Sequence, residues 1–310
     1  MGAWLKRREA ELAKSSRAAY RQAIDRFLKH LGERENAPLE RLTERDVLSF
    51  RDSIAAELSQ TTANNLLKLV RVILNAARLD GLMQHDPAAR VKALRAVKHD
   101  DESRRAFTMD ELRAVLEAAG ESEWRSLVLF GLYTGQRIGD LARLRWSSVD
   151  VAAGEIRLTT SKTGRRVLVP ICAPLREFIL SLPASDDPAA PVHPEAATLS
   201  APHLSRQFGD LLAQAGLRAN HGHRKREDRT DRRREVNALS FHSLRHTATS
   251  LLKNAGVSAV IVQDIIGHES AEVSRAYTHI DGATKLAALD KLPDVLAGGK
   301  APRPDRKKKG

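Results

Sequence analysis

The sequence has little cysteine, few aromatic residues and no long apolar run. Its single cysteine, Cys172, cannot form an internal disulfide, which excludes a secreted disulfide scaffold and a cysteine-rich zinc module. No apolar run approaches the roughly 18 residues of a membrane span, and the first residues lack the apolar core of a signal peptide. We therefore expect a cytosolic or nucleoid-associated protein with no membrane-spanning segment.

Positive charge is in clear excess. The chain has 51 Lys and Arg against 39 Asp and Glu, a formal net charge of +12. Most of the excess lies in three segments: 1–98 with 19 basic and 12 acidic residues, 219–238 with seven and four, and 299–310 with six and one. This distribution favours an anionic polymer as partner, and composition alone leaves DNA, RNA and a membrane surface open.

The length of 310 residues suggests two domains. Apolar residues recur at helical spacing in the first hundred residues, which predicts a helical bundle over 1–97. We expect three helices there, starting at Ser15 or Ser16, at Thr43 with a capping box to Asp46, and at Thr61 or Thr62. The polar run 98–106 has no periodicity and is expected to be the linker.

The second domain is expected over 107–298. Its apolar spacing is mostly helical, and two β-branched runs around Lys162-Thr163-Gly164 predict a hairpin. The polar stretch 219–238 is typical of an exposed loop, and the basic, Pro-containing tail 299–310 of a disordered end. The fold class predicted is mainly α with a small antiparallel β-sheet.

Six polar residues stand in otherwise apolar segments of the second domain. They are Arg137 in TGQRIGD, Lys162 in SKTG, His242 and Arg245 in FHSLRH, His268 in IIGH and Tyr277 in SRAYTH. His242 and Arg245 are three residues apart and share one helical face. Each residue alone is typical of a surface or structural position, but together the six could converge on one anion.

These segments, in this order, resemble the boxes of the tyrosine recombinase (phage integrase) family. The resemblance covers essentially all of 107–285, and the helical segment 15–97 is similar to the family's core-binding domain. It implies a helical core-binding domain followed by a tyrosine-recombinase-type catalytic domain, in a simple two-domain form without an arm-binding domain. The activity implied is site-specific cutting and rejoining of duplex DNA through a 3′-phosphotyrosyl intermediate, in integration, excision or resolution.

The resemblance also implies a role for each residue. Tyr277 is the expected nucleophile, and paired guanidiniums of Arg137 and Arg245 are suited to hold the nonbridging phosphate oxygens. A phenol with a pKa near 10 needs help to lose its proton, and His242 is expected to take part in that transfer. The remaining expectations are Lys162 as the acid that protonates the leaving 5′ oxygen, His268 as a hydrogen-bond donor to the phosphate, Asp140 as the residue that orients Arg137, and His246 as a supporting neighbour.

The partners implied are duplex DNA with paired recombination half-sites and further copies of the chain, as a dimer and then a tetramer on DNA. GATKLAALDKLPDVL, after Tyr277, has the apolar spacing of a docking helix that packs either in cis or on another protomer. No cofactor and no metal are expected, because a phosphotyrosyl bond conserves the energy of the phosphodiester. The residues Cys172, His193, His203, His221 and His223 match no zinc spacing.

Two alternatives remain at this stage. A type IB topoisomerase-like enzyme would use similar residues to relax supercoils, and an architectural DNA-binding protein would bind without catalysis. The complete set of six residues argues against the second. The other two tyrosines, Tyr20 and Tyr133, lie in apolar helical patterns and are expected to be packing residues. A protein acting on DNA is expected in the cytoplasm, associated with the nucleoid.

Overall fold

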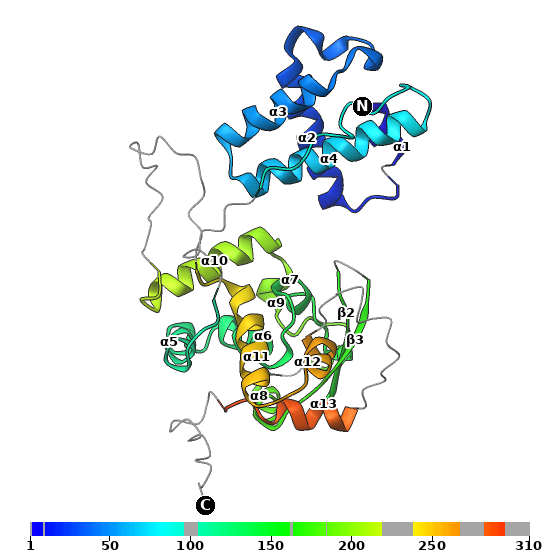
Figure 1. Cartoon of the computed structure of the whole chain (residues 1–310). Helices are drawn as coiled ribbons and strands as arrows, with labels where there is room; N and C mark the ends of the chain where they lie inside the picture. Colours follow the sequence, from blue (N-terminus) through cyan, green and yellow to red (C-terminus); the bar gives the residue numbers. More distant parts are fainter. Residues whose placement is uncertain are drawn as a thin grey trace, which may run out of the picture. The chain divides into compact units, whose positions relative to one another are not determined.

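The computed structural model describes residues 2–8, 10–95, 105–161, 164–183, 185–218, 238–266 and 282–294. The chain divides into two compact units, the first made by helices α1 to α4 and the second by α5 to α13 (Figure 1). Several sequence-based expectations lie outside the described residues: Lys162, His268, Tyr277, most of the linker 98–106, most of the loop 219–238 and the tail 299–310.

The first unit is entirely helical in its described part. Its helices are α1 (Gly2–Arg7), α2 (Lys14–Leu31), α3 (Glu44–Glu57) and α4 (Gln60–Leu79), with short 3-10 turns at Gly32–Asn36 and Leu39–Arg41. The core lies between α2, α3 and α4, where the rings of Phe27 and Phe50 meet edge to face at 5.1 Å. The prediction of a helical bundle is confirmed, although α1 was not foreseen.

Of the three helix starts predicted in this unit, one is confirmed and two are wrong. Helix α2 begins at Lys14 with Ala13 at the N-cap position and no side-chain cap, so neither Ser15 nor Ser16 caps it. Thr43 and Asp46 form the predicted capping box at the start of α3. The prediction that α4 starts at Thr61 or Thr62 is wrong, because Ser59 is the cap and its Oγ accepts a hydrogen bond from the Thr62 amide at 3.3 Å. A serine two or three residues upstream thus caps the helix in place of either threonine.

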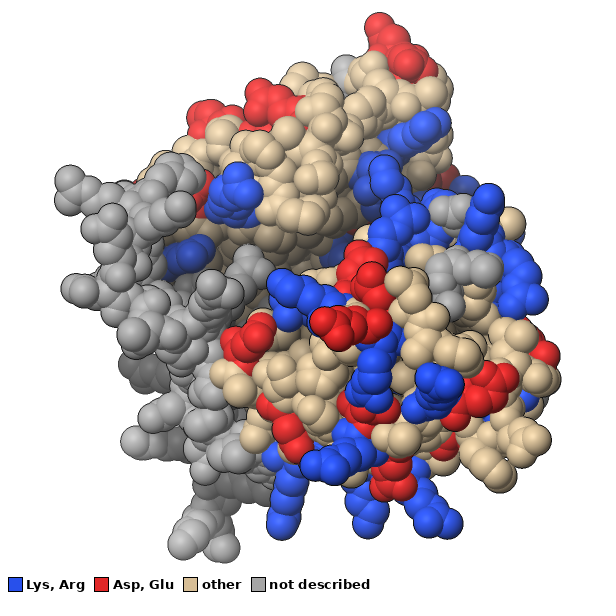
Figure 2. Space-filling view, turned by 90° about the horizontal axis from the view of Figure 1, so that it is seen from above, with Lys and Arg blue, Asp and Glu red and all other residues tan. Residues whose placement is uncertain are grey.

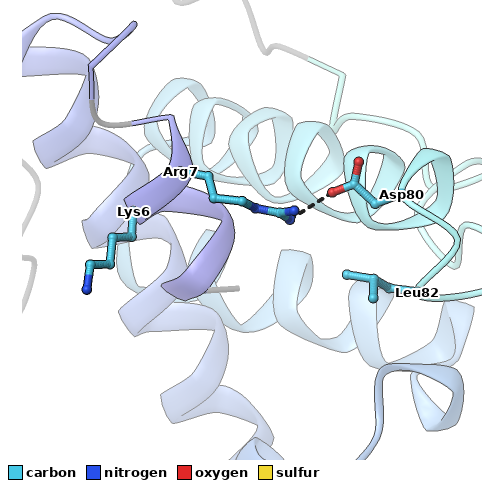
Figure 3. Close-up of a pocket in the computed structure, with 4 residues that line it drawn as sticks. All are labelled: Lys6, Arg7, Asp80 and Leu82. Atoms are coloured by element: carbon cyan, nitrogen blue, oxygen red, sulfur yellow. Dashed lines mark hydrogen bonds and ion pairs between the residues drawn. The ribbon is translucent and has the colours of Figure 1, made fainter.

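A pocket of the first unit lies between α1 and the end of α4. It is lined by Lys6, Arg7, Asp80 and Leu82 (Figure 3). Arg7 Nη2 reaches across to Asp80 Oδ2 at 2.9 Å, while the Lys6 side chain points away from this ion pair. Both partners are well exposed, so the ion pair contributes about 0–1 kcal/mol to stability.

The second unit is mainly helical around one small sheet. Its elements are α5 (Met109–Ala119), α6 (Glu123–Thr134), α7 (Ile138–Leu141), a 3-10 turn (Trp146–Ser148), β1 (Val149–Asp150), β2 (Glu155–Thr159), β3 (Arg166–Pro170), α8 (Ala173–Ser181), α9 (Pro194–Ala197), α10 (Ala201–Gln214), α11 (Phe241–Asn254), α12 (Ala259–Ile266) and α13 (Gly282–Leu289). The expected fold class, mainly α with a small antiparallel sheet, is confirmed.

The sheet is antiparallel, with strand order β1-β2-β3. Thr159 pairs with Arg166 at the end of β2 and β3 that adjoins the predicted turn, so the predicted hairpin is confirmed. Strand β1 was not foreseen, because two residues are too short to show an alternating pattern.

Helix α6 is the centre of the second unit and fixes the position of α11. Every residue from Ser126 to Thr134 is buried, as expected for a helix packed on several sides. Gly131 lets α11 come close, since a Cβ at this position would lie 2.8 Å from Phe241 Cζ and 2.9 Å from Leu244 Cδ1. The face of α11 next to His242 and Arg245 is therefore held against the core.

Both tyrosines expected to be packing residues have that role. Tyr133 is 1% exposed and its hydroxyl donates to the Pro293 carbonyl oxygen at 3.3 Å. Tyr20 packs edge to face on Trp4 at 5.1 Å.

Many charged side chains are exposed, and Lys and Arg are interspersed with Asp and Glu on the face seen in Figure 2. Across the described residues, no helix combines the length and the apolar content needed to cross a membrane.

Candidate active site

The two expected arginines are brought close to each other. Arg245, on α11, is 2% exposed and donates from Nη1 to the Gly135 carbonyl oxygen at 2.8 Å. The pKa of Arg245 is lowered to about 10, mainly by burial and also by the nearby charge of Arg137, while the charge of Asp140 opposes both effects. Arg245 therefore remains protonated at neutral pH. Arg137 is the residue immediately before α7 and is partly exposed.

The turn between α6 and α7 carries Arg137 and has little freedom. Gly135 has a φ of +64°, which side-chain-bearing residues rarely adopt. A Cβ at Gly135 would also lie 2.3 Å from Ile266 Cδ1, at the end of α12. The turn is thus held by Arg245 of α11 on one side and packed against α12 on another.

Gln136, between Gly135 and Arg137, adds a polar link to α12. Its side chain is 2% exposed, and Nε2 donates to the Thr134 carbonyl oxygen at 3.0 Å and to the Ile265 carbonyl oxygen at 3.4 Å. Nothing in the sequence pattern pointed to this residue. Its link places the Arg137 turn against the last residues of α12, which lead directly to His268.

Asp140 contacts the hairpin. Its carboxylate is buried, and Oδ1 accepts from the Ser161 amide at 2.9 Å and from Ser161 Oγ at 2.6 Å. Sequence reasoning missed Ser161, whose only signal is its position immediately before Lys162. The negative charge of Asp140 also raises the pKa of Arg245, so this carboxylate stabilises the protonated guanidinium of Arg245. That Asp140 orients Arg137 stays a prediction.

The rings of the two histidines of α11 contact each other one helical turn apart. The rings of His242 and His246 lie edge to face at 4.9 Å. Both side chains are partly exposed, whereas Arg245 between them is buried. His242 is therefore open to solvent on the helix that holds Arg245.

Lys162, His268 and Tyr277 lie outside the described residues, but described elements flank each of them. Ser161 precedes Lys162, α12 ends at Ile266 two residues before His268, and α13 starts five residues after Tyr277. Helix α13 packs on β3 and α12 of its own chain.

His193 is a buried histidine with a structural contact pattern. It is 0% exposed, with Nδ1 3.0 Å from the Leu141 carbonyl oxygen and Nε2 2.9 Å from Ser126 Oγ. Burial lowers its pKa to about 4, so the ring is neutral at pH 7, donating from Nδ1 and accepting at Nε2. In the described part of the chain, no three His, Cys, Asp or Glu side chains form a group that could hold a metal ion.

Arg245 is buried on one helix, and Arg137 lies close to it on the turn before another helix. Two guanidiniums placed in this way are suited to hold a phosphate group. The comparisons agree. The family described as "Phage integrase family" matches residues 105–283, and "Phage integrase, N-terminal SAM-like domain" matches residues 6–81. The chain therefore belongs to the phage integrase family.

Two relatives named as a recombinase and an integrase match this chain, the first over nearly its whole length. Tyrosine recombinase XerD of Mycobacterium tuberculosis is 30% identical, over 94% of this chain and 93% of the relative. The integrase of Escherichia phage lambda is 25% identical, over 78% of this chain and 65% of the relative. The protein is thus a site-specific DNA recombinase that cuts and rejoins DNA strands, and the topoisomerase-like and non-catalytic alternatives are not favoured.

Solved structures show the same fold. A lambda integrase (75–356) dimer bound to a COC′ core site matches with a TM-score of 0.65 at 20% identity, covering 91% of this chain and 98% of that chain. The Tn1549 transposon integrase in complex with a circular intermediate DNA matches with a TM-score of 0.66 at 18% identity, covering 94% and 98%.

Proposed function

We propose that this recombinase cleaves DNA with Tyr277 and forms a 3′-phosphotyrosyl intermediate. The observation that carries the proposal is the pairing of Arg245 with the turn that holds Arg137. Two guanidiniums close together can bind both nonbridging oxygens of the scissile phosphate and stabilise the charge that develops there. The buried position of Arg245 strengthens this effect, because charges interact more strongly where water is excluded.

The chemical step balances without a cofactor. The phenol oxygen of Tyr277 attacks phosphorus, the bond from phosphorus to the 5′ oxygen breaks, and the new phosphotyrosyl ester keeps the energy needed for rejoining. His242 accepts the phenol proton, and Lys162 donates a proton to the leaving 5′ oxygen. His268 donates a hydrogen bond to the phosphate. Rejoining follows the same steps in reverse, with a 5′ hydroxyl as the attacking group.

We assign DNA gripping to the first unit and chemistry to the second. Residues 1–98 hold 19 basic and 12 acidic side chains, suited to a phosphate backbone, with 98–106 as linker and 107–298 as catalytic domain. The tail 299–310 adds further positive charge. Because a lambda integrase tetramer is known on a Holliday junction, we extend to this chain a dimer and then a tetramer on paired half-sites, in the cytoplasm and at the nucleoid.

The test is covalent trapping on DNA. The probe is a library of nicked duplexes with randomised arms, from which the protein selects substrates by forming adducts that survive denaturing detergent. The wild-type chain is expected to form adducts without ATP and in the presence of a chelator. Tyr277→Phe is expected to form none while it still binds the selected duplex.

Two results would contradict the proposal. Adducts formed by Tyr277→Phe would place the nucleophile elsewhere, and a strict requirement for Mg²⁺ would exclude the metal-free step. Tyr20→Phe is the matched control, because Tyr20 packs on Trp4 in the first unit and its substitution is expected to leave adduct formation unchanged.

A further inference from the structure

The turn of the hairpin between β2 and β3 is held on both sides by carboxylates from other elements. On one side, Ser161 donates two hydrogen bonds to the buried Asp140 of α7. At the other, Arg165 Nη2 pairs with Asp264 Oδ1 of α12 at 3.1 Å. The two carboxylates come from the segment of Arg137 and from the helix that leads to His268.

The base of the turn is closed between these anchors. Thr160 donates to the Arg165 carbonyl oxygen at 2.9 Å, and Gly164 donates to the Thr160 carbonyl oxygen at 2.8 Å. With Ser161 and Arg165 both fixed, only residues 162–164 connect them. The described residues on both sides of this short connection, Ser161 and Arg165, are therefore each anchored to another element.

Asp264 also receives a second cation. Lys285 of α13 lies with Nζ 2.5 Å from Asp264 Oδ2, and its side chain is only 13% exposed. The carboxylate thus uses one oxygen for the hairpin and the other for α13. This arrangement allows the two contacts to be removed separately by substitution.

We propose that Ser161 and Arg165 are positioning residues for the leaving-group step: anchored on Asp140 and Asp264, they hold the hairpin so that Lys162 can protonate the 5′ oxygen. The inference rests on the proposed function, in which Lys162 is the acid. Neither residue touches the DNA chemistry itself in this account. Their effect is on how often the ammonium group reaches the oxygen that leaves.

The experiment compares two leaving groups on one selected duplex. In one substrate the scissile 5′ oxygen is normal, and in the other it is replaced by sulfur, whose thiolate leaves without protonation. Single-turnover cleavage is measured at saturating protein for Ser161→Ala, Arg165→Ala and Asp264→Ala, with Lys162→Ala as reference. We expect each anchor variant to slow the oxygen substrate about 10-fold, and the sulfur substrate less than about 2-fold.

Matched variants separate positioning from folding. Ser161→Thr keeps the hydroxyl and is expected to cleave the oxygen substrate at nearly the wild-type rate. Thr159→Ala removes an exposed hydroxyl of β2 and is expected to change neither rate. Lys285→Ala removes the other cation of Asp264 and is expected to leave the ratio of the two rates unchanged.

The outcomes distinguish failure of the positioning role of Ser161 and Arg165 from failure of the acid role of Lys162. Equal slowing of both substrates by the anchor variants, or no slowing of either, overturns the positioning role even if Lys162→Ala shows the sulfur preference. If Lys162→Ala itself slows both substrates equally, the acid role of Lys162 fails and the inference fails with it. If all three anchor variants cleave the oxygen substrate slowly but the sulfur substrate at nearly the wild-type rate, the positioning role is supported.

Discussion

Arg245 Nη1 donates a hydrogen bond to the backbone carbonyl oxygen of Gly135 at 2.8 Å, which ties α11 to the turn that carries Arg137. A lysine carries all its donors on one nitrogen, so it does not reproduce the planar fork in which one nitrogen keeps this bond while another binds a phosphate oxygen. We expect Arg245→Lys to slow adduct formation by about 10²–10³-fold. The measurement is the single-turnover rate on the selected duplex, with affinity followed by gel shift.

The matched control is Arg113→Lys on α5, where the partly exposed side chain of Arg113 pairs with Asp110 one turn earlier. It is expected to cleave like the wild type. If Arg245→Lys also cleaves normally, Arg245 does not hold the phosphate.

Gly135→Ala is expected to destabilise the second unit. The positive φ costs about 1–3 kcal/mol for a residue with a Cβ, and contact with Ile266 Cδ1 adds to this cost. Ile266→Val removes the clashing atom. We therefore expect the double variant Gly135→Ala/Ile266→Val to be more stable than the sum of the two single effects, in urea unfolding experiments. Strict additivity would show that α12 does not press on this turn.

His193 is expected to make stability depend on pH. Its pKa is about 4 in the folded chain and near 6.5 when unfolded, so below pH 6.5 the unfolded state binds more protons. This contribution is constant above pH 6.5 and is lost as the pH falls towards 4, by about 3 kcal/mol in total. The free energy of unfolding, measured from pH 7 to pH 4, tests this.

His193→Gln supplies the comparison for that experiment. The variant has no titrating ring, so its stability should fall less steeply than that of the wild type between pH 6.5 and 4. Parallel curves for the two proteins would mean that the ring of His193 is not held in the neutral state.

Local signals in the sequence were sufficient where one short segment determines the structure. The capping box at Thr43 depends on two side chains three residues apart, and it forms as the pattern indicates. The hairpin follows from two β-branched runs around a glycine turn. Box motifs likewise led to Arg137 and Arg245, which the structure brings close together.

Contacts between distant segments were not predictable from such patterns. Ser161 and Asp140 are 21 residues apart, and His193 and Ser126 are 67 apart. Their pairing depends on which helix faces are buried against each other, and polarity alone does not show it. The start of α4 was predicted wrongly for a local reason: Ser59, Thr61 and Thr62 can each act as an N-cap, and the sequence pattern does not show which of them does.

The most direct test of the account is to identify the residue that carries the DNA after trapping. Trypsin releases the chain's three tyrosines in different peptides, 18–21, 126–137 and 276–285. After nuclease digestion of the adduct, mass spectrometry is expected to find the nucleotide remnant on peptide 276–285, at Tyr277. A remnant on 18–21 or 126–137, or on a residue other than tyrosine, would contradict the central claim.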